Sequence, residues 1–236
     1  MTAEQIIQPA PGKGLGEPPA KFSDFQYAAS TSSSPTMGPT DSEARNLATI
    51  LETGRLLAGT LELNRALASV LETLGRHHGI VRSFVSLVDP ETNDLRIVAS
   101  HGLDETATRR VSYKIGEGIT GRVVQSGKSI VVPQVSREPM FLDRMGVRKK
   151  TLARQELTFV SVPIVINGKA IGALGVDIKY AATRDYERAT NFLAVIATMI
   201  AQAVKVDHLI EADRRRLLDE NIHLRQELRE RYDFSH

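Results

Sequence analysis

The sequence predicts an α/β protein of the α+β type, built on a central antiparallel sheet of five or six strands. Apolar residues recur at three- and four-residue steps from residue 41, which is the period of amphipathic helices. Between residues 83 and 178, short segments rich in Val, Ile and Phe are separated by turn residues, a pattern typical of antiparallel strands. A longer helical pattern then follows to residue 232.

The N-terminal region divides into an arm and two helices. Residues 1–40 hold six Pro, four Gly and five Ser with little apolar periodicity, so we expect a disordered arm. The helical pattern that follows is expected to break at Gly54, Gly59 and Thr60, with Thr60 capping the second helix. Gly79 is expected to end that helix.

The predicted strands lie at residues 83–89, 95–102, 129–135, 157–166 and 169–178, with Tyr113–Ile115 as a possible sixth. The first two flank "PETND", a natural hairpin loop. The last two are joined by Asn167 and Gly168, which both tolerate positive φ and therefore favour a type I′ turn.

The C-terminal pattern predicts one long helix. "DYERATNFLAVIATMIAQAV" has a single apolar side, and no breaker separates it from the polar residues 205–236. There, one seam of a heptad pattern holds Ala203, Ile210, Leu217 and Leu224, and the other holds Asp207, Arg214, Asn221 and Leu228. This weak coiled-coil pattern favours a dimer stalk, and a single solvated helix is the alternative.

Composition excludes several classes of function. Lys and Arg number 30 against 28 Asp and Glu, so the chain lacks the cationic surplus of a DNA-binding segment. The absence of Cys excludes disulfides and cysteine-ligated metal sites. Because no uninterrupted apolar run approaches about 18 residues, we expect a soluble, cytoplasmic protein that does not contact a membrane.

Three glycines raise the question of a cofactor site. Gly116, Gly118 and Gly121 spell G-x-G-x-x-G, the pattern that cradles a pyrophosphate in dinucleotide-binding folds. Such a fold needs a buried strand before the glycines and a long helix after them. Here the preceding strand is the brief "SYKI", and Ser126 and Gly127 end the helix early, so a dinucleotide role is disfavoured.

Three segments together resemble the GAF domain family of small-molecule sensors: "RSFVSLVDPETNDLRIVASHGL", "YKIGEGITGRVVQSGKSIVVPQVSREPMFLD" and "FVSVPIVINGKAIGALGVD". The resemblance runs from about residue 46 to residue 204 and implies a GAF domain over residues 41–204. It implies that the first and last helices pack on one face of the sheet, while loops and short helices cover a pocket on the other. It also implies that Gly116, Gly118 and Gly121 form a structural turn at the pocket rim.

The last segment, "ENIHLRQELRERYDFSH", resembles the linker that joins the GAF domain of NifA-type activators to an AAA+ ATPase domain. That resemblance implies that residues 205–236 are a signalling helix toward a missing ATPase domain. It implies control of nitrogen fixation through 2-oxoglutarate or through PII-type or NifL-type proteins.

Two groups of residues are candidates for ligand binding. Five cations fall within eleven residues, beside the apolar Phe141: Arg144, Arg148, Lys149, Lys150 and Arg154. They predict a clamp for an anion such as a dicarboxylate, an acidic partner surface, or a solvated basic loop. Phe84, Ser86, Phe159 and Ser161 alternate on their strands, so they either line one face of a pocket or belong to the core.

Catalysis is not expected. Ser86 and Ser161 lack a G-x-S-x-G elbow, and the adjacent His77 and His78 are expected to point apart on a helix surface and make a poor metal pair. A GAF enzyme such as a free methionine sulfoxide reductase needs catalytic cysteines, which are absent. No metal or cofactor is predicted.

The sequence thus favours a non-enzymatic sensory domain of a nitrogen-fixation activator, homodimeric through its terminal helices. The alternative is a ligand-free interaction and dimerisation module whose pocket is filled by its own side chains.

Overall fold

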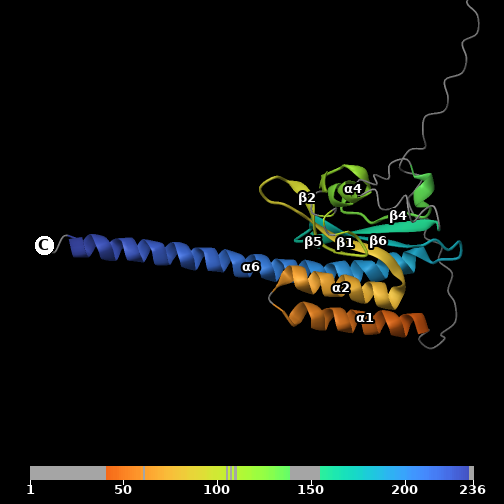
Figure 1. Ribbon diagram of the computed structural model, residues 1–236, viewed down its shortest axis with the longest axis horizontal. Helices are drawn as coiled ribbons and strands as arrows, with labels where there is room; N and C mark the ends of the chain where they lie inside the picture. Colours follow the sequence, from red (N-terminus) through yellow and green to blue (C-terminus); the bar gives the residue numbers. More distant parts are fainter. Residues whose placement is uncertain are drawn as a thin grey trace, which may run out of the picture. The chain divides into compact units, whose positions relative to one another are not determined.

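The computed structural model describes residues 41–60, 62–104, 106, 108, 111–138 and 155–233. They form a six-stranded antiparallel sheet of order β3-β2-β1-β6-β5-β4 (Figure 1). The strands are β1 (Ile80–Val88), β2 (Asp94–His101), β3 (Ser112–Lys114), β4 (Ile130–Val132), β5 (Leu157–Ile166) and β6 (Lys169–Lys179). The predicted strands are all present, including the sixth. The arm predicted at residues 1–40 lies outside the described residues.

Two local turns form as their sequences predict. Asn167 and Gly168 have φ angles of 50° and 77°, so both residues between β5 and β6 take the positive values that a type I′ turn requires. Gly79, at the end of the second helix, has φ 63°. Positive φ costs glycine little, so these residues stop their elements where the pattern indicates.

The helices cover the two faces of the sheet unequally. α2 (Leu63–His78) and the first part of α6 (Tyr186–Asp233) pack on one face of the sheet, and α1 (Asp41–Ala58) packs against these two helices to complete a three-helix layer; α4 (Gly118–Ser126) lies on the other face (Figure 1). A short 3-10 helix, η2 (Val135–Arg137), follows β4. The large core lies under the three-helix layer, where Val85, Leu174 and Val176 of the sheet meet Leu71 and Ile196 of the helices.

The helical pattern breaks at Gly59 and Thr60 as predicted, but not at Gly54. Gly54 does not break α1; a Cβ at this position would lie 3.3 Å from the Met199 side chain, so the glycine lets α1 approach α6 closely. α1 ends only at Ala58, and the N-cap of α2 is Glu62. Thr60 still contributes, because its hydroxyl accepts a hydrogen bond from the Glu62 N–H at 3.1 Å.

α6 is one helix of 48 residues that changes environment part of the way along. Its first part packs on the sheet through Leu193, Ile196 and Ile200, and Val204 is its last fully buried residue. An 18-residue window within Tyr186–Glu227 has a mean hydropathy of 1.6 and the composition of a membrane span, with 33% of the window buried. Beyond Val204 the heptad residues Ile210, Leu217 and Leu224 are exposed.

Candidate functional site

The face of the sheet opposite the three-helix layer is built from rows of residues that pair across neighbouring strands. One row holds Phe84, Gly175 and Ser161, and the next holds Arg82, Asp177 and Phe159. Ser86 pairs with Ala173 in a third row. Because paired residues point to the same face, the four residues predicted from strand alternation do share one surface.

Two aromatic rings meet over a glycine at the centre of this surface. The rings of Phe84 and Phe159 stack with their centroids 6.2 Å apart and an interplanar angle of 16°. A Cβ at Gly175 would lie 2.5 Å from the Phe84 ring, so only glycine leaves room for it. The strand between the two phenylalanines therefore forms the floor on which their rings rest.

The two serines of this surface are both fully buried but differ in hydrogen bonding. The Ser86 hydroxyl donates to the Ala173 carbonyl at 3.3 Å. The Ser161 hydroxyl is buried without a hydrogen-bond partner. A buried hydroxyl without a partner costs free energy, so Ser161 is a buried unsatisfied group on this face.

A buried ion pair that the sequence analysis did not identify adjoins the aromatic pair. The Arg82 Nε lies 3.1 Å from Asp177 Oδ2, and the two residues are 3% and 1% exposed. Each is a single charged residue inside an otherwise apolar strand pattern, "IVRSFV" and "LGVDI". That isolation was the available signal, since charges are rarely buried unless paired.

Apolar side chains from several elements pack with the phenylalanines. The second buried cluster consists of Phe84, Phe159 and Leu157 from the sheet, Val132 from β4, Ile119 from α4 and Val135 from η2. Of the two interpretations of the strand residues, pocket lining or core, their burial fits core packing in this conformation. A ligand that contacts them has to displace part of this cluster.

The glycine motif forms a tight turn between β3 and α4. Gly116 and Gly118 have φ angles of 87° and 59°. The Gly116 N–H donates to the Gly121 carbonyl at 2.9 Å, and a Cβ at Gly121 would collide with the Lys114 carbonyl oxygen. The glycines thus serve backbone geometry, because two need positive φ and the third a close backbone approach.

The basic candidates, Phe141, Arg144, Arg148, Lys149, Lys150 and Arg154, lie outside the described residues. Glu156, which follows them, is held in place: its carboxylate accepts hydrogen bonds from the Ser136 N–H and the Leu157 N–H, both at 3.1 Å, and from the Ser136 hydroxyl. Burial raises the pKa of this carboxyl, but the hydrogen bonds from Ser136 and Leu157 outweigh it and hold the pKa below its ordinary value.

A second set of contacts joins the end of β4 to the start of α6. The Thr158 hydroxyl, on β5, donates to the Pro133 carbonyl at 2.7 Å. It also lies 3.4 Å from the Tyr186 hydroxyl, which is 3.3 Å from the Ala181 carbonyl. Thr158 therefore connects the segment after β4 with the first residue of α6.

His77 and His78 do not point apart as predicted. Both rings contact the Thr49 hydroxyl on α1, at 3.1 Å from His77 Nδ1 and 2.9 Å from His78 Nε2. The last turn of α2 lies beside α1, so neighbouring side chains reach the same atom. Burial, then the charges of His77 and Arg45, lower the pKa of His78 to about 4. The described part of the chain holds no group of three metal-ligating side chains.

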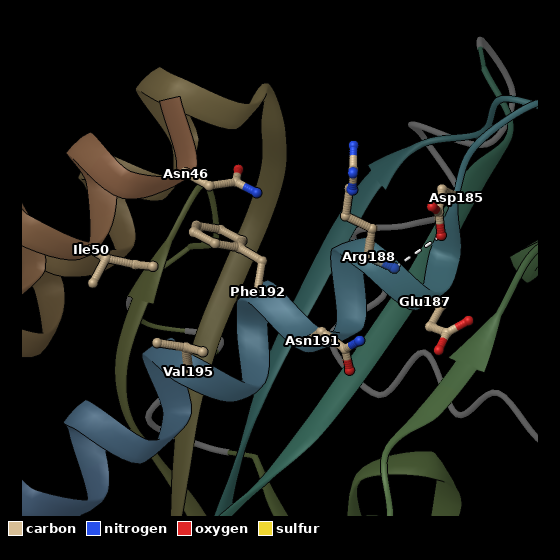
Figure 2. A pocket seen from close by; sticks show the side chains of 8 residues that line it. All are labelled: Asn46, Ile50, Asp185, Glu187, Arg188, Asn191, Phe192 and Val195. Carbon is tan, nitrogen blue, oxygen red and sulfur yellow. Dashed lines mark hydrogen bonds between the residues drawn. The ribbon is translucent and has the colours of Figure 1, made fainter. Parts of the chain in front are cut away.

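Three cavities lie in the helical layer. Figure 2 shows one of about 400 Å³ between α1 and the start of α6, where Asn46 and Ile50 face Phe192 and Val195. A second, of about 340 Å³, adjoins it, and a third, of about 450 Å³, is lined mainly by apolar residues between the α1–α2 junction and α6. None of the three is lined by Phe84, Ser86, Phe159 or Ser161.

Comparison with known proteins agrees with this architecture. Residues 60–205 match the model of the GAF domain. The chain is similar to the GAF domain of Aquifex aeolicus nlh2 in an inactive state, with a TM-score of 0.62, 25% identity, and coverage of 69% of this chain and 97% of that one. It also shares its fold with a free methionine-R-sulfoxide reductase from Neisseria meningitidis, with a TM-score of 0.61, 18% identity, and coverage of 75% and 98%.

Sequence relatives are named as Nif-specific regulatory proteins or as nitrogen fixation proteins. The chain is 35% identical to the Nif-specific regulatory protein of Azospirillum brasilense over 78% of its own length and 29% of that protein. It is 31% identical to the nitrogen fixation protein VnfA of Azotobacter vinelandii over 79% of its length and 36% of that protein. The chain thus spans about a third of the length of these curated relatives.

Proposed function

Because this chain belongs to the GAF domain family, we propose that it acts as the sensory domain of a NifA-type activator and controls an attached AAA+ ATPase. Its relatives are Nif-specific regulators, so its role is regulatory. We propose that it acts in the cytoplasm and catalyses no reaction. The signal is either a small metabolite, with 2-oxoglutarate as the first candidate, or a regulatory protein of the PII or NifL type.

One observation supports this proposal: α6 is a single helix that begins in the core of the sensory domain and continues beyond it. Ile196 and Ile200 are fully buried against the sheet, whereas the same helix is exposed from His208 to Glu227. A helix bends little within one turn, so a shift of its buried part also moves its exposed part. Ligand or partner binding that favours one packing of the sheet would thereby shift the population of α6 positions.

Thr158 offers a route from the sheet face to α6. Its hydroxyl contacts both the Pro133 carbonyl and the Tyr186 hydroxyl. Phe159, the next residue, points to the opposite face and belongs to the aromatic pair. A displacement of β5 at the aromatic pair would therefore be felt at the first residue of α6.

A second function, that of a ligand-free interaction module, is favoured by the packing of the sheet face. Phe84 and Phe159 are almost fully buried within their own apolar cluster. In this alternative, regulation passes through protein contacts on the helices and no metabolite enters.

Calorimetric titration of the chain with 2-oxoglutarate, beside a pull-down with PII-type and NifL-type proteins, separates the two functions. A saturable heat supports the metabolite sensor, whereas protein capture without heat supports the interaction module. If neither is seen, the chain does not sense nitrogen status through either route and the proposal is wrong.

The route through Thr158 has its own test. Thr158→Val keeps the shape of the side chain but removes both hydrogen bonds, whereas Thr198→Val removes only a bond to the Ala194 carbonyl within α6. Hydrogen exchange over α6 is measured with and without the signal that the titration or pull-down identifies. We expect Thr158→Val to bind normally but to lose the change in exchange, and Thr198→Val to keep it. An unchanged response in Thr158→Val would remove this residue from the route.

We also propose that α6 pairs with a second copy of itself. Ile210, Leu217 and Leu224 fall on one heptad seam and are 48%, 54% and 51% exposed. Sedimentation analysis should show a dimer that Leu217→Asp dissociates. Leu209→Asp, off this seam and 62% exposed, is the matched control and should leave the dimer intact. A monomer at all concentrations contradicts the pairing.

A further inference from the structure

The two adjoining cavities between α1 and the start of α6 have features of a binding site. They share Asn46, Asp185, Arg188 and Phe192 in their walls. The inner one, of about 340 Å³, is a half-open cavity lined by residues of α1, the end of α2, β1, β6 and the start of α6. Its volume is in the range of sites for small molecules.

The wall of the inner cavity carries more positive than negative charge. Three arginines, Arg45, Arg184 and Arg188, line it against one acid, Asp185. Among the residues that the structure describes, Arg188 is ion-paired with Glu43 at 2.8 Å, and Arg184 donates to the Lys179 carbonyl at 3.4 Å. The Arg45 guanidinium forms no ion pair with the residues that the structure describes. Two cations are thus left without a carboxylate partner there.

The floor of the same cavity is apolar. Ile80 and Ile178 are 6% exposed, Val176 is 1% exposed, and Leu193 completes this edge of the main core. Cations at the mouth and hydrocarbon at the floor match a ligand with one charged end and one apolar end. Guanidinium groups bind carboxylate and phosphate through paired hydrogen bonds, and an apolar body is favoured on such a floor.

We propose that this cavity binds a small organic anion, whose phosphate or carboxylate group pairs with Arg45 and Arg184 while its apolar body rests on Ile80 and Ile178. The site lies on the helical layer and does not depend on the sheet-face site or on 2-oxoglutarate. The ligand would bridge α1 and α6 beside the Glu43–Arg188 ion pair, and so would stabilise the base of α6.

The lowered pKa of His78 agrees with a positive electrostatic potential in this cavity. It lines the cavity, and Arg45 is among the charges that lower its pKa to about 4, after burial and His77. The groups around it are Arg45 on α1, His77 on α2, and Arg184, Asp185 and Arg188 at the start of α6. An anion bound between the arginines would oppose their charge, so the His78 pKa should rise on binding.

The experiment is an NMR titration of the whole chain with four probes: phenyl phosphate, benzoate, inorganic phosphate and neutral benzyl alcohol. We expect saturable shifts at residues 42–46 and 184–189 with the first two probes. Inorganic phosphate should bind about tenfold more weakly because it lacks the apolar body. Benzyl alcohol should bind more weakly still, and raising the salt concentration should weaken the anions only.

Variants locate the site. Arg45→Gln and Arg184→Gln should each reduce phenyl phosphate affinity at least fivefold, whereas Arg65→Gln should not. Arg65 lies on α2 with its side chain 79% exposed. Arg65→Gln is therefore the matched control, because it removes one cation outside the cavity. The preference for phosphate over carboxylate distinguishes the two possible head groups.

Three outcomes overturn the proposal. The first is an equal affinity for phenyl phosphate in all three variants. The second is NMR shifts that are confined to Phe84, Phe159 and their neighbours. The third is the absence of a saturable NMR shift with any of the anions. Only the second would leave the sheet face as the sole ligand site, so failure here is distinct from failure of the sensory function.

Discussion

One face of the sheet carries a continuous apolar core, whereas the opposite face combines two aromatic rings with a glycine, two serines and an ion pair. Under α1, α2 and α6, Val85, Val160 and Leu174 are fully buried in the main core, and Ser83 on the same face has a buried hydroxyl without a hydrogen-bond partner. On the α4 side, the Arg82–Asp177 pair is buried where an apolar pair of similar volume is often as stable or more stable, and Gly175 leaves room for the Phe84 ring. Both faces are buried, so burial alone does not distinguish them.

The contrast indicates what each face is for. A face selected only for stability has no need of a buried charge pair or of a residue that cannot carry a side chain. Departures of this kind concentrate at functional sites in folded proteins. The changes below, three on the α4 side and one on the helical side, test this contrast, starting from the largest expected effect.

The ion pair should give the largest effect. Asp177→Ala leaves the buried Arg82 without its carboxylate, which should lower the free energy of unfolding by about 3–5 kcal/mol. Denaturant unfolding measures this. The double variant Arg82→Met with Asp177→Leu should recover most of the loss, because a well-packed apolar pair replaces buried charges. A double variant as unstable as Asp177→Ala would mean that the pair itself stabilises this face.

Gly175 should come next. Gly175→Ala places a methyl group against the Phe84 ring, so we expect a loss of about 1–3 kcal/mol in the free energy of unfolding. Adding Phe84→Leu should relieve part of that loss, since the shorter side chain vacates the contact. If Gly175→Ala is as stable as the wild type, the rings move freely and the floor is not fixed.

The helical side should respond to pH through His78. Its pKa of about 4 in the folded protein lies below the ordinary 6.5, so the unfolded chain binds a proton that the folded protein does not between these values. Stability is therefore complete above about pH 6.5 and falls as the pH drops toward 4. Allowing for partial exposure, the loss attributable to His78 is about 1 kcal/mol. Thermal unfolding of His78→Gln should lack this part of the pH dependence; an unchanged profile would assign it to other groups.

The two serines should give the smallest and most specific difference. Ser86→Ala breaks a hydrogen bond to the Ala173 carbonyl and should cost about 1 kcal/mol, whereas Ser161→Ala removes an unpartnered hydroxyl and should be neutral or stabilising. Chemical denaturation of the two single variants is the measurement. Equal losses would show that Ser161 is satisfied in solution and is not a free group of the site.

The features that could be predicted are those that depend on residues close together in the sequence. Strands from β1 to β6 follow from local alternation, and the turn at Asn167 and Gly168 follows from two residues. The contacts between side chains on the α4 side of the sheet could not be predicted from local patterns. Arg82 and Asp177 are 95 residues apart, and only the register of β1 on β6 makes them a pair.

Tertiary contacts also explain the predictions that were wrong. Glycine often ends helices, but α1 continues through Gly54, where a Cβ would lie 3.3 Å from the Met199 side chain of α6. His77 and His78 would diverge on an isolated helix, but α1 presents the Thr49 hydroxyl to both. Neither neighbour is visible from the local pattern, so a single sequence does not contain the signal.

The length of α6 beyond the core has a mechanical consequence. At about 1.5 Å per residue, the stretch from Val204 to Asp233 extends about 43 Å. A tilt of about 5° at its buried base would displace the far end by about 4 Å, on the order of one helical turn. The helix therefore acts as a lever arm, in which a change too small to alter the core becomes a displacement on the scale of a side chain.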